Sequence, residues 1–299
     1  MRIESRLRSS FGDFFREAGF ARKLSVRGTQ TIAWIIIPFA LCNAQEDVEP
    51  TALEIHEWTK QLAIDDWIIQ SVALEELGKR KVEKAVPEIR KILNQGKSSW
   101  LKGRAMLALA KILGKEMVPT AQEATKGKDA IIRRAALQTL DLVGGKTSVP
   151  LARELLKDPV MEVRSMAAAL YASEFPGEAW PTVERLTRLD KTKVSSDLLR
   201  ALAHIGSEEA LKRMEQLFHD PDTEKGRGRE IIKALAVTED EGISLLARLT
   251  VHYNSGQAEF QLGKNLLLPR EKKRVSSLIK EMVQAEDTSF LGNTASLMA

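Results

Sequence analysis

Residues 132–152 read IRRAALQTLDLVGGKTSVPLA, and this stretch holds one complete unit of a pattern that recurs along most of the chain. Its apolar side chains share one face of a helix, at Ile132, Ala135, Ala136, Leu140 and Val143. Gly144-Gly145 is expected to end this helix, because glycine readily takes the left-handed conformation common at helix C-termini. Val149-Pro150 is expected to begin a second helix, since a proline in the first turn loses no hydrogen bond. The stretch therefore predicts two helices joined by a short turn.

The same features return with a period of about 31 residues. A Val-Pro or Trp-Pro dipeptide stands at residues 86–87, 118–119, 149–150 and 180–181. A column of small or apolar residues runs through Ala73, Ala105, Ala136, Ala167, Leu198, Ile231 and Leu262. Four residues later lies a column of larger ones, at Leu77, Leu109, Leu140, Tyr171, Leu202, Leu235 and Leu266. Because a single helix pair cannot bury its own apolar face, three columns in one register predict a stack of about seven pairs.

Two further patterns concern the junction between units. Asp158-Pro159 precedes the next first helix, with Asp158 expected as the N-cap and Pro159 as the first helical residue. His219-Asp220-Pro221 repeats this arrangement. Basic residues occupy one position of successive first helices, where we expect polar contacts between units, at Lys102, Arg133 and Arg164.

These units resemble HEAT repeats, and the short period with its V-R-x-x-A-x-x-x-L…G…V-P pattern is similar to the short, lyase-type subclass. The resemblance covers residues 66–284 and fades in the last two units, where the proline disappears. It implies an all-α, right-handed α-solenoid of about seven HEAT-like helix pairs. It also implies that the second helices line a concave face that binds another protein or a peptide. The alternative that it implies is an enzyme subunit similar to the phycobilin lyases.

The N-terminal segment has the pattern of a targeting signal. Residues 31–41, TIAWIIIPFAL, form a short apolar run after a basic stretch, and Ala44 follows at a suitable cleavage position. We therefore predict that residues 1–44 are a signal peptide and that the protein is exported, to the periplasm or the cell envelope. The run is shorter than the roughly 20 apolar residues that span a bilayer. An uncleaved membrane anchor at residues 31–41 remains the alternative.

Two details of this segment stay open. The basic stretch is long, and one explanation is that translation starts near Val26. Cys42, the single cysteine of the chain, would need a small residue before it to be lipidated, but Leu41 stands there. After cleavage no cysteine would remain for a disulfide, a nucleophile or a metal ligand. Downstream, we expect a capping helix within residues 45–65, the repeats over 66–284 and a loose tail at 285–299.

The recognisable motifs of catalysis and ligand binding are incomplete. Gly145-Lys146-Thr147 resembles the end of a P-loop, but Leu140 stands where that motif needs glycine. His56-Glu57 begins like the zinc motif H-E-x-x-H, but Lys60 replaces the second histidine. The sequence contains no G-x-S-x-G, and its four histidines are scattered. We therefore expect no enzyme activity, no cofactor and no metal site.

The charge distribution argues against nucleic acid as a partner. The chain has 45 basic and 41 acidic residues, and residues 1–44 carry seven of the basic and three of the acidic ones. The rest is therefore neutral, whereas a nucleic-acid-binding surface is basic. Some HEAT-like folds resemble DNA glycosylases, which need an aromatic pocket in a basic cleft. We instead expect the tryptophans to pack in different repeat positions, at Trp67, Trp100 and Trp180.

One column of residues is a candidate binding site. Near the C-termini of successive second helices stand Asn94, Lys126, Lys157, Arg188, His219 and His252. Cations at this position complement the helix dipole, which is one explanation for the column. The other is a cationic groove for an acidic peptide or a polyanionic polymer, although Glu123, Glu154 and Glu184 intervene on the same helices. We predict a protein or acidic peptide as the partner, with a membrane involved only if residues 1–44 remain attached.

Overall fold

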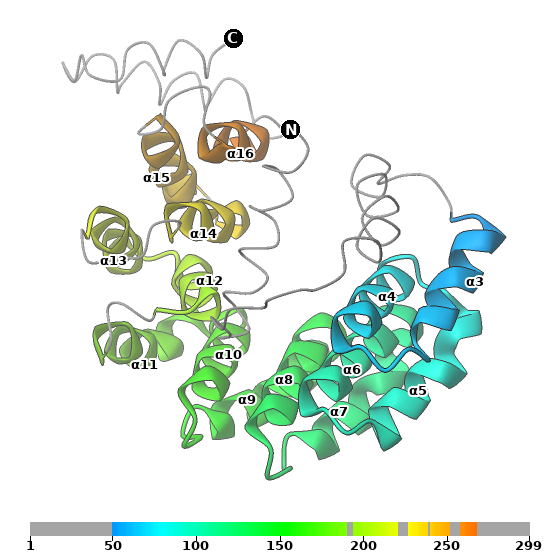
Figure 1. The fold of residues 1–299 in the computed structure, drawn as a ribbon. Coiled ribbons are helices and arrows are strands. Elements are labelled where there is room, and N and C mark those ends of the chain that lie inside the picture. Colours follow the sequence, from blue (N-terminus) through cyan, green and yellow to red (C-terminus); the bar gives the residue numbers. More distant parts are fainter. Residues whose placement is uncertain (1–49, 190–193, 221–226, 239, 252–257, 268–299) are drawn as a thin grey trace, which may run out of the picture. The chain divides into compact units, whose positions relative to one another are not determined.

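The computed structural model describes residues 50–189, 194–220, 227–238, 240–251 and 258–267. Every secondary-structure element in these residues is a helix (Figure 1). Within them, no helix is both long enough and apolar enough to cross a membrane. The predicted targeting segment at residues 1–44, the predicted tail at 285–299 and the last part of the repeat array lie outside the described residues.

The helices alternate as the period predicts. The first helices of the pairs are α4 (Trp67–Lys79), α6 (Ser99–Leu113), α8 (Ala130–Val143), α10 (Met161–Ala172), α12 (Ser196–Ile205), α14 (Arg227–Ala234) and α16 (Ala258–Leu267). The second helices are α5 (Val86–Gln95), α7 (Val118–Ala124), α9 (Val149–Leu155), α11 (Pro176–Leu189), α13 (Glu208–His219) and α15 (Asp240–Val251). Short 3-10 turns join some of them, at η1 (Glu83–Ala85), η2 (Gly114–Met117), η3 (Gly145–Ser148) and η5 (Leu235–Val237). The predicted all-α solenoid of helix pairs is confirmed.

A further helix, α3 (Ala52–Gln61), precedes the first pair and packs on α4. Its N-terminus carries a capping box, in which the Thr51 hydroxyl accepts a hydrogen bond from the Glu54 N–H and the Glu54 carboxylate accepts one from the Thr51 N–H. The side chains of Trp58, within α3, and of Leu62, directly after it, are buried, whereas Leu53 is 76% exposed. The helix therefore covers the start of the array with one apolar face.

The core lies along the two repeat columns. The small column is fully buried at Ala73, Ala105, Ala136, Ala167, Leu198 and Ile231. Each first helix packs on the next one, from α4 through to α16. The close approach is seen at Gly103 of α6, where an added Cβ would stand 2.9 Å from the Cβ of Ala135 in α8. Small residues in these positions let successive first helices stack tightly, as the sequence indicated.

The predicted turns are confirmed in the first half of the array. Helix α8 ends at Val143, and Gly145 has a φ of +54°, which favours glycine. Helices α5, α7 and α9 each begin with a Val-Pro dipeptide, with proline in the first turn. The fourth dipeptide is different, because α11 begins at Pro176 and Pro181 lies inside the helix. An earlier proline has taken the favourable first position, and Pro181 cannot donate to the carbonyl of Gly177.

The prediction that Asp158 caps the next first helix is wrong. Helix α10 begins at Met161, its N-cap is Val160, and no side chain caps it. The Asp158 carboxylate instead accepts a hydrogen bond from the Val160 N–H at 2.8 Å and forms an ion pair with Arg133. A buried carboxylate is stabilised more by a guanidinium than by a helix terminus alone. Asp158 therefore links two neighbouring units instead of capping a helix. In the related His219-Asp220-Pro221, Pro221 lies outside the described residues.

The pairs form two layers, one of first helices and one of second helices. First helices contact one another along the array, whereas α5, α7 and α9 pack mainly on the first helix that follows each of them. Arg134 of α8 also bonds Asp197 of α12 at 2.9 Å, although α10 stands between these helices. Side chains of α8 and α12 thus meet across α10 within the first-helix layer. The first-helix layer is called the inner layer below, and the second-helix layer is called the outer layer.

Candidate binding surface on the second helices

The structure places the predicted cationic column at the C-terminal ends of the second helices. Lys126 and Lys157 follow the last turns of α7 and α9, and Arg188 and His219 lie in the last turns of α11 and α13. All four side chains are exposed, as is Asn94 of α5. His252 lies outside the described residues. The column is thus on the outer layer, where the last carbonyls of each helix favour a positive charge.

The members of this column differ in their ionic partners. Lys126 pairs with Glu123 at 3.1 Å, and Arg188 pairs with Glu184 at 2.7 Å. Both acids belong to the same helix or helix end as the cation, which is an arrangement that stabilises isolated helices. Lys157 has no ion-pair partner in the structure. The His219 ring contacts that of Phe218 edge to face at 5.0 Å between centroids. The column is therefore not a uniform row of available positive charges.

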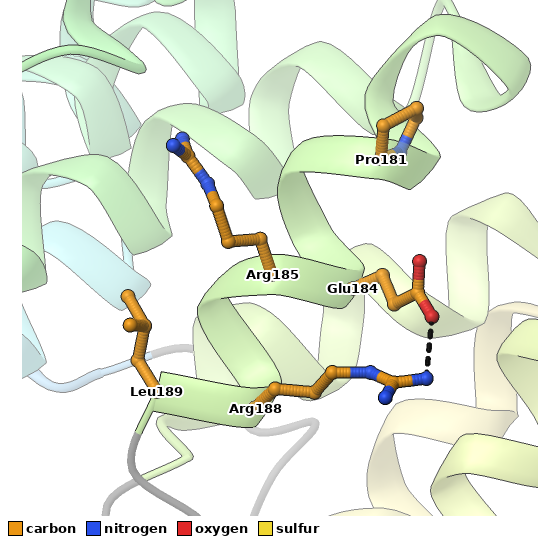
Figure 2. Close-up of a pocket in the computed structure, with 5 residues that line it drawn as sticks. All are labelled: Pro181, Glu184, Arg185, Arg188 and Leu189. Carbon is orange, nitrogen blue, oxygen red and sulfur yellow. Dashed lines mark hydrogen bonds and ion pairs between the residues drawn. The ribbon is translucent and has the colours of Figure 1, made fainter.

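Two adjoining hollows lie on this layer around α11. One, of about 510 Å³, is lined by residues of α9, α10 and α11, at Arg153, Glu154, Leu156, Lys157, Tyr171, Glu178, Thr182 and Arg185. The other, of about 470 Å³, is lined by Pro181, Glu184, Arg185, Arg188 and Leu189 (Figure 2). Arg185 lines both. The hollow of about 510 Å³ lies between α9 and α11 and is called the α9–α11 hollow below.

The carboxylates around the hollows are engaged to different degrees. The Tyr171 hydroxyl donates to Glu178 at 2.6 Å, and this bond, together with burial, raises the pKa of Tyr171. Arg153 lies 3.8 Å from the same carboxylate. Glu184 is bound by Arg188, and Figure 2 shows the Arg185 side chain pointing away from that pair. Within the described ranges, Lys157, Arg185 and Glu154 take part in no ion pair, so two positive charges and one negative charge around the hollow are uncompensated.

Positive charge also accumulates toward α13. Arg213 of that helix donates to the Thr187 carbonyl of α11 at 2.7 Å. Burial and the nearby charge of Arg188 lower the pKa of Arg213. The carboxylates of Asp220 and Glu184 act on that pKa in the opposite direction, so the charge around α11 is mixed. Arg188 and Arg213 place two guanidinium groups on this part of the second-helix layer.

At the basic position of the first helices, the predicted polar contacts are confirmed for Arg133 and Arg164. Arg133 donates to both Asp158 oxygens, at 2.8 and 2.9 Å, and to the carbonyls of Gly127 and Lys128. Arg164, one period later, donates to the carbonyls of Asp158 and Pro159. Burial would raise the pKa of Asp158, but hydrogen bonds from Arg133 and Val160 outweigh it and lower that pKa. These arginines tie the end of one unit to the start of the next.

The motifs set aside in the sequence also have structural positions. Gly145-Lys146-Thr147 lies in the η3 turn between two helices, where Lys146 approaches Glu174 at 3.8 Å. In the part of the chain that the structure describes, no three metal-ligating side chains come together. Trp67 and Trp100 meet edge to face at 5.4 Å between ring centroids, so these two pack on each other.

Sequence reasoning missed Arg185 and Arg153. Neither belongs to the column, because Arg185 lies three residues before the column member Arg188 and Arg153 lies four residues before the column member Lys157. A signal was present, since residues three and four apart share a helix face, α11 carries two cations three apart, and Lys157 follows α9 four residues after Arg153. What the sequence did not contain was the spacing between α9 and α11 that forms the hollow. The sequence also gave no indication that the Arg134 side chain bonds Asp197, 63 residues away in the chain.

Comparison with known proteins bears on the repeats themselves. A family model described as HEAT repeats matches residues 55–141. No characterised protein matches the chain in sequence. Among solved structures, the chain is similar to the complex of CpcE and CpcF of phycocyanin lyase from Nostoc sp. PCC7120, with a TM-score of 0.46 and 18% sequence identity. That alignment covers 74% of this chain and 96% of the other. Residues 55–141 are HEAT repeats, which confirms the family resemblance, and the later helix pairs continue their period.

Proposed function

We propose that this protein is an exported, non-enzymatic HEAT-repeat scaffold that binds an acidic segment of another protein through its second-helix layer. The observation that carries the proposal is the α9–α11 hollow, because it gathers Arg153, Lys157 and Arg185 on the outer layer. Solenoids of stacked repeats offer extended surfaces on which a partner contacts several units at once. Such binding needs shape and charge, and no reactive group.

Packing within the array supports the choice of layer. Helices α9 and α11 both pack on α10, and the hollow between them opens at the surface. On the inner layer, by contrast, Arg134 and Arg200 are engaged by Asp197 and Asp141. A partner on that side would have to displace ion pairs already formed, which costs free energy. The outer layer therefore offers the more accessible charge.

Within the predicted column, Lys126, Lys157, Arg188, His219 and His252, we propose that the residues at the hollows contribute most. Lys157 lines one hollow and Arg188 lines the other. Lys126 is bound to Glu123, so its contact with a partner would replace an existing ion pair. The exposed His219 would extend the path toward the C-terminal end of the described array.

Site-specific crosslinking tests the scaffold function. A photoreactive amino acid placed at position 157 or 188 of the full chain is expected to capture one discrete protein in the cells that make it. The comparison position is Gln138 of α8, an uncharged and half-buried residue on a first helix. Capture of the same protein at equal yield from position 138 would contradict the assignment to the second-helix layer. Capture of no protein from any of the three positions would contradict the scaffold function.

Export is tested separately, at the N-terminus. If residues 1–44 are a cleaved signal peptide, mass spectrometry of the exported fraction is expected to find a mature chain that begins at Gln45. An intact leader in the membrane fraction would favour the anchor at residues 31–41. An intact leader in the cytoplasm would contradict export altogether.

A further inference from the structure

We infer that the α9–α11 hollow anchors the partner by one carboxylate side chain, an Asp or a Glu, held between Lys157 and Arg185. This inference rests on the proposed function and deepens it, because it names the chemical group that the scaffold recognises. The two cations come from different helices, so an anion between them would join α9 to α11.

The local charge supports a carboxylate as the anchoring group. Lys157 and Arg185 are both exposed and line the same hollow, and neither has an ion-pair partner among the residues that the structure describes. The neighbouring Glu178 is already occupied by the Tyr171 hydroxyl and by Arg153. An incoming carboxylate would therefore gain two new attractions without breaking an existing ion pair. A guanidinium and an ammonium from two sides suit a carboxylate, whose two oxygens accept separate hydrogen bonds.

The remaining lining of the hollow combines apolar and polar groups. Leu156 and the body of the Tyr171 ring are apolar, while the Thr182 hydroxyl can donate a hydrogen bond. A side chain that carries methylene groups below a carboxylate fits this combination of apolar wall and polar end. The hollow, at about 510 Å³, also has room for the backbone that carries the side chain. A peptide segment is thus a better match than a bare small anion.

Acidic residues near Lys157 and one period earlier supply the controls. Glu154 lines the same hollow and has no ion-pair partner in the described part of the chain, so it opposes an incoming carboxylate. Exactly one period earlier, Glu123 and Lys126 occupy the positions that Glu154 and Lys157 occupy here, but they pair with each other and line neither hollow. The chain therefore offers the same residues in the same helix positions with and without the hollow.

Fluorescence anisotropy of a labelled octaglutamate peptide, titrated with the full chain at low salt, tests the inference. Lys157→Gln and Arg185→Gln are each expected to weaken binding about threefold, and the double variant about tenfold, since exposed ion pairs are worth up to about 1 kcal/mol. Glu154→Gln is expected to strengthen binding about twofold by removing a repulsion. Lys126→Gln and Glu123→Gln, the matched controls, are expected to change the affinity by less than either effect.

The outcomes separate this inference from the function on which it rests. Equal losses from Lys126→Gln and Lys157→Gln would show attraction to net charge alone and would overturn the site. So would a higher affinity for inorganic polyphosphate than for octaglutamate that is lost in the double variant, because the hollow would then select phosphate. If crosslinking at position 157 captures a partner while octaglutamate binds all variants alike, the scaffold stands and the carboxylate anchor falls. All five substituted side chains are exposed, and unchanged circular dichroism would verify that the five single variants and the double variant fold.

Discussion

At the scale of single residues, Asp158 shows how the array handles a buried charge. Its side chain is 3% exposed, and Arg133, itself 11% exposed, meets it with two hydrogen bonds. Arg133 also satisfies two backbone carbonyls of the preceding turn, so the ion pair and the turn form one network. Removing one member of such a pair leaves the other charged, buried and unpaired, which is the costly outcome.

Replacement of Asp158 by Ala is therefore expected to lower the free energy of unfolding by about 3 kcal/mol. Urea denaturation followed by circular dichroism measures the change. The exposed pair of Lys91 and Glu88 serves as the control, because Glu88→Ala should cost less than about 0.5 kcal/mol. A loss at Asp158 no larger than that at Glu88 would mean that the network does not stabilise the junction.

The same carboxylate predicts a dependence of stability on pH. The pKa of Asp158 is lowered in the folded protein, so its contribution is present above the unfolded value of about 3.9 and is lost as the pH falls through the folded value. Between pH 5 and pH 3 the wild type is expected to lose more stability than Asp158→Asn, which carries no titrating group at this position. Urea midpoints at the two pH values give the comparison. Equal losses would exclude Asp158 as a source of acid sensitivity.

At the scale of helices, the spacing between successive first helices depends on very small side chains. Gly103 of α6 faces Ala135 of α8 so closely that an added Cβ would stand 2.9 Å from the alanine Cβ. Ala135 has no flexible end that could move away, so the two helices would have to separate. Tight packing of this kind responds to a single extra methyl group.

Gly103→Ala is accordingly expected to destabilise the protein by about 1–2 kcal/mol, although alanine is the better helix former by roughly 1 kcal/mol. Gly177 of α11 gives the opposite expectation, because no atom lies within 4 Å of a Cβ added there. Gly177→Ala should stabilise by about 0.5 kcal/mol through helix propensity. Thermal or urea unfolding measures both. Stabilisation by both substitutions would show that the contact between α6 and α8 is not tight.

The helices were largely predictable from the sequence because their signals are local. The period, the Val-Pro starts of α5, α7 and α9 and the glycine turn after Val143 depend on residues close in the chain. The exceptions arise where a distant partner or a competing local signal decides. The Asp-Pro dipeptide predicts a cap at Asp158, but Arg133, which engages that carboxylate, is 25 residues away in the chain. The repeat predicts a helix start at Pro181, but α11 already begins at Pro176.

The candidate binding surface was predictable in part for the same reason. Periodicity placed Lys157 and Arg188 on one layer, since their positions within the helices follow from the repeat. The pairing of Lys126 with Glu123, the availability of Arg185 and the hollow itself depend on side-chain directions and on the gap between helices. These are properties of packing in three dimensions, which the repeat pattern leaves open.

At the scale of the whole described array, one region departs from simple stacking. Helix α10 is buried at nine of its twelve positions, and the helices on either side of it are joined directly. Arg134 bonds Asp197 at 2.9 Å, and Arg200 bonds Asp141 at 2.8 Å. The Arg200 guanidinium also donates a hydrogen bond to the Met166 sulfur in α10, with a nitrogen–sulfur distance of 3.5 Å. Two ion pairs thus connect α8 to α12 across the helix between them.

Asp197→Asn is expected to weaken this connection, because Asp197 is the largely buried partner of Arg134. Amide hydrogen exchange in α10 should become faster, while exchange in α6 should stay unchanged. The control is Arg104→Gln, which removes a 2.7 Å ion pair to Glu75 between adjacent first helices. Unchanged exchange in α10 after Asp197→Asn would mean that packing alone stabilises α10 between α8 and α12.

The bond between α8 and α12 changes how the array should come apart. In an ideal linear repeat protein each unit senses only its immediate neighbours, so melting can start at either end and advance one unit at a time. A link that skips a unit removes that independence for three consecutive pairs. The segment from α8 to α13 is then expected to open in a single cooperative step, while the outer pairs fray separately. Truncations that end inside it should lose far more stability than the length of the removed segment would suggest.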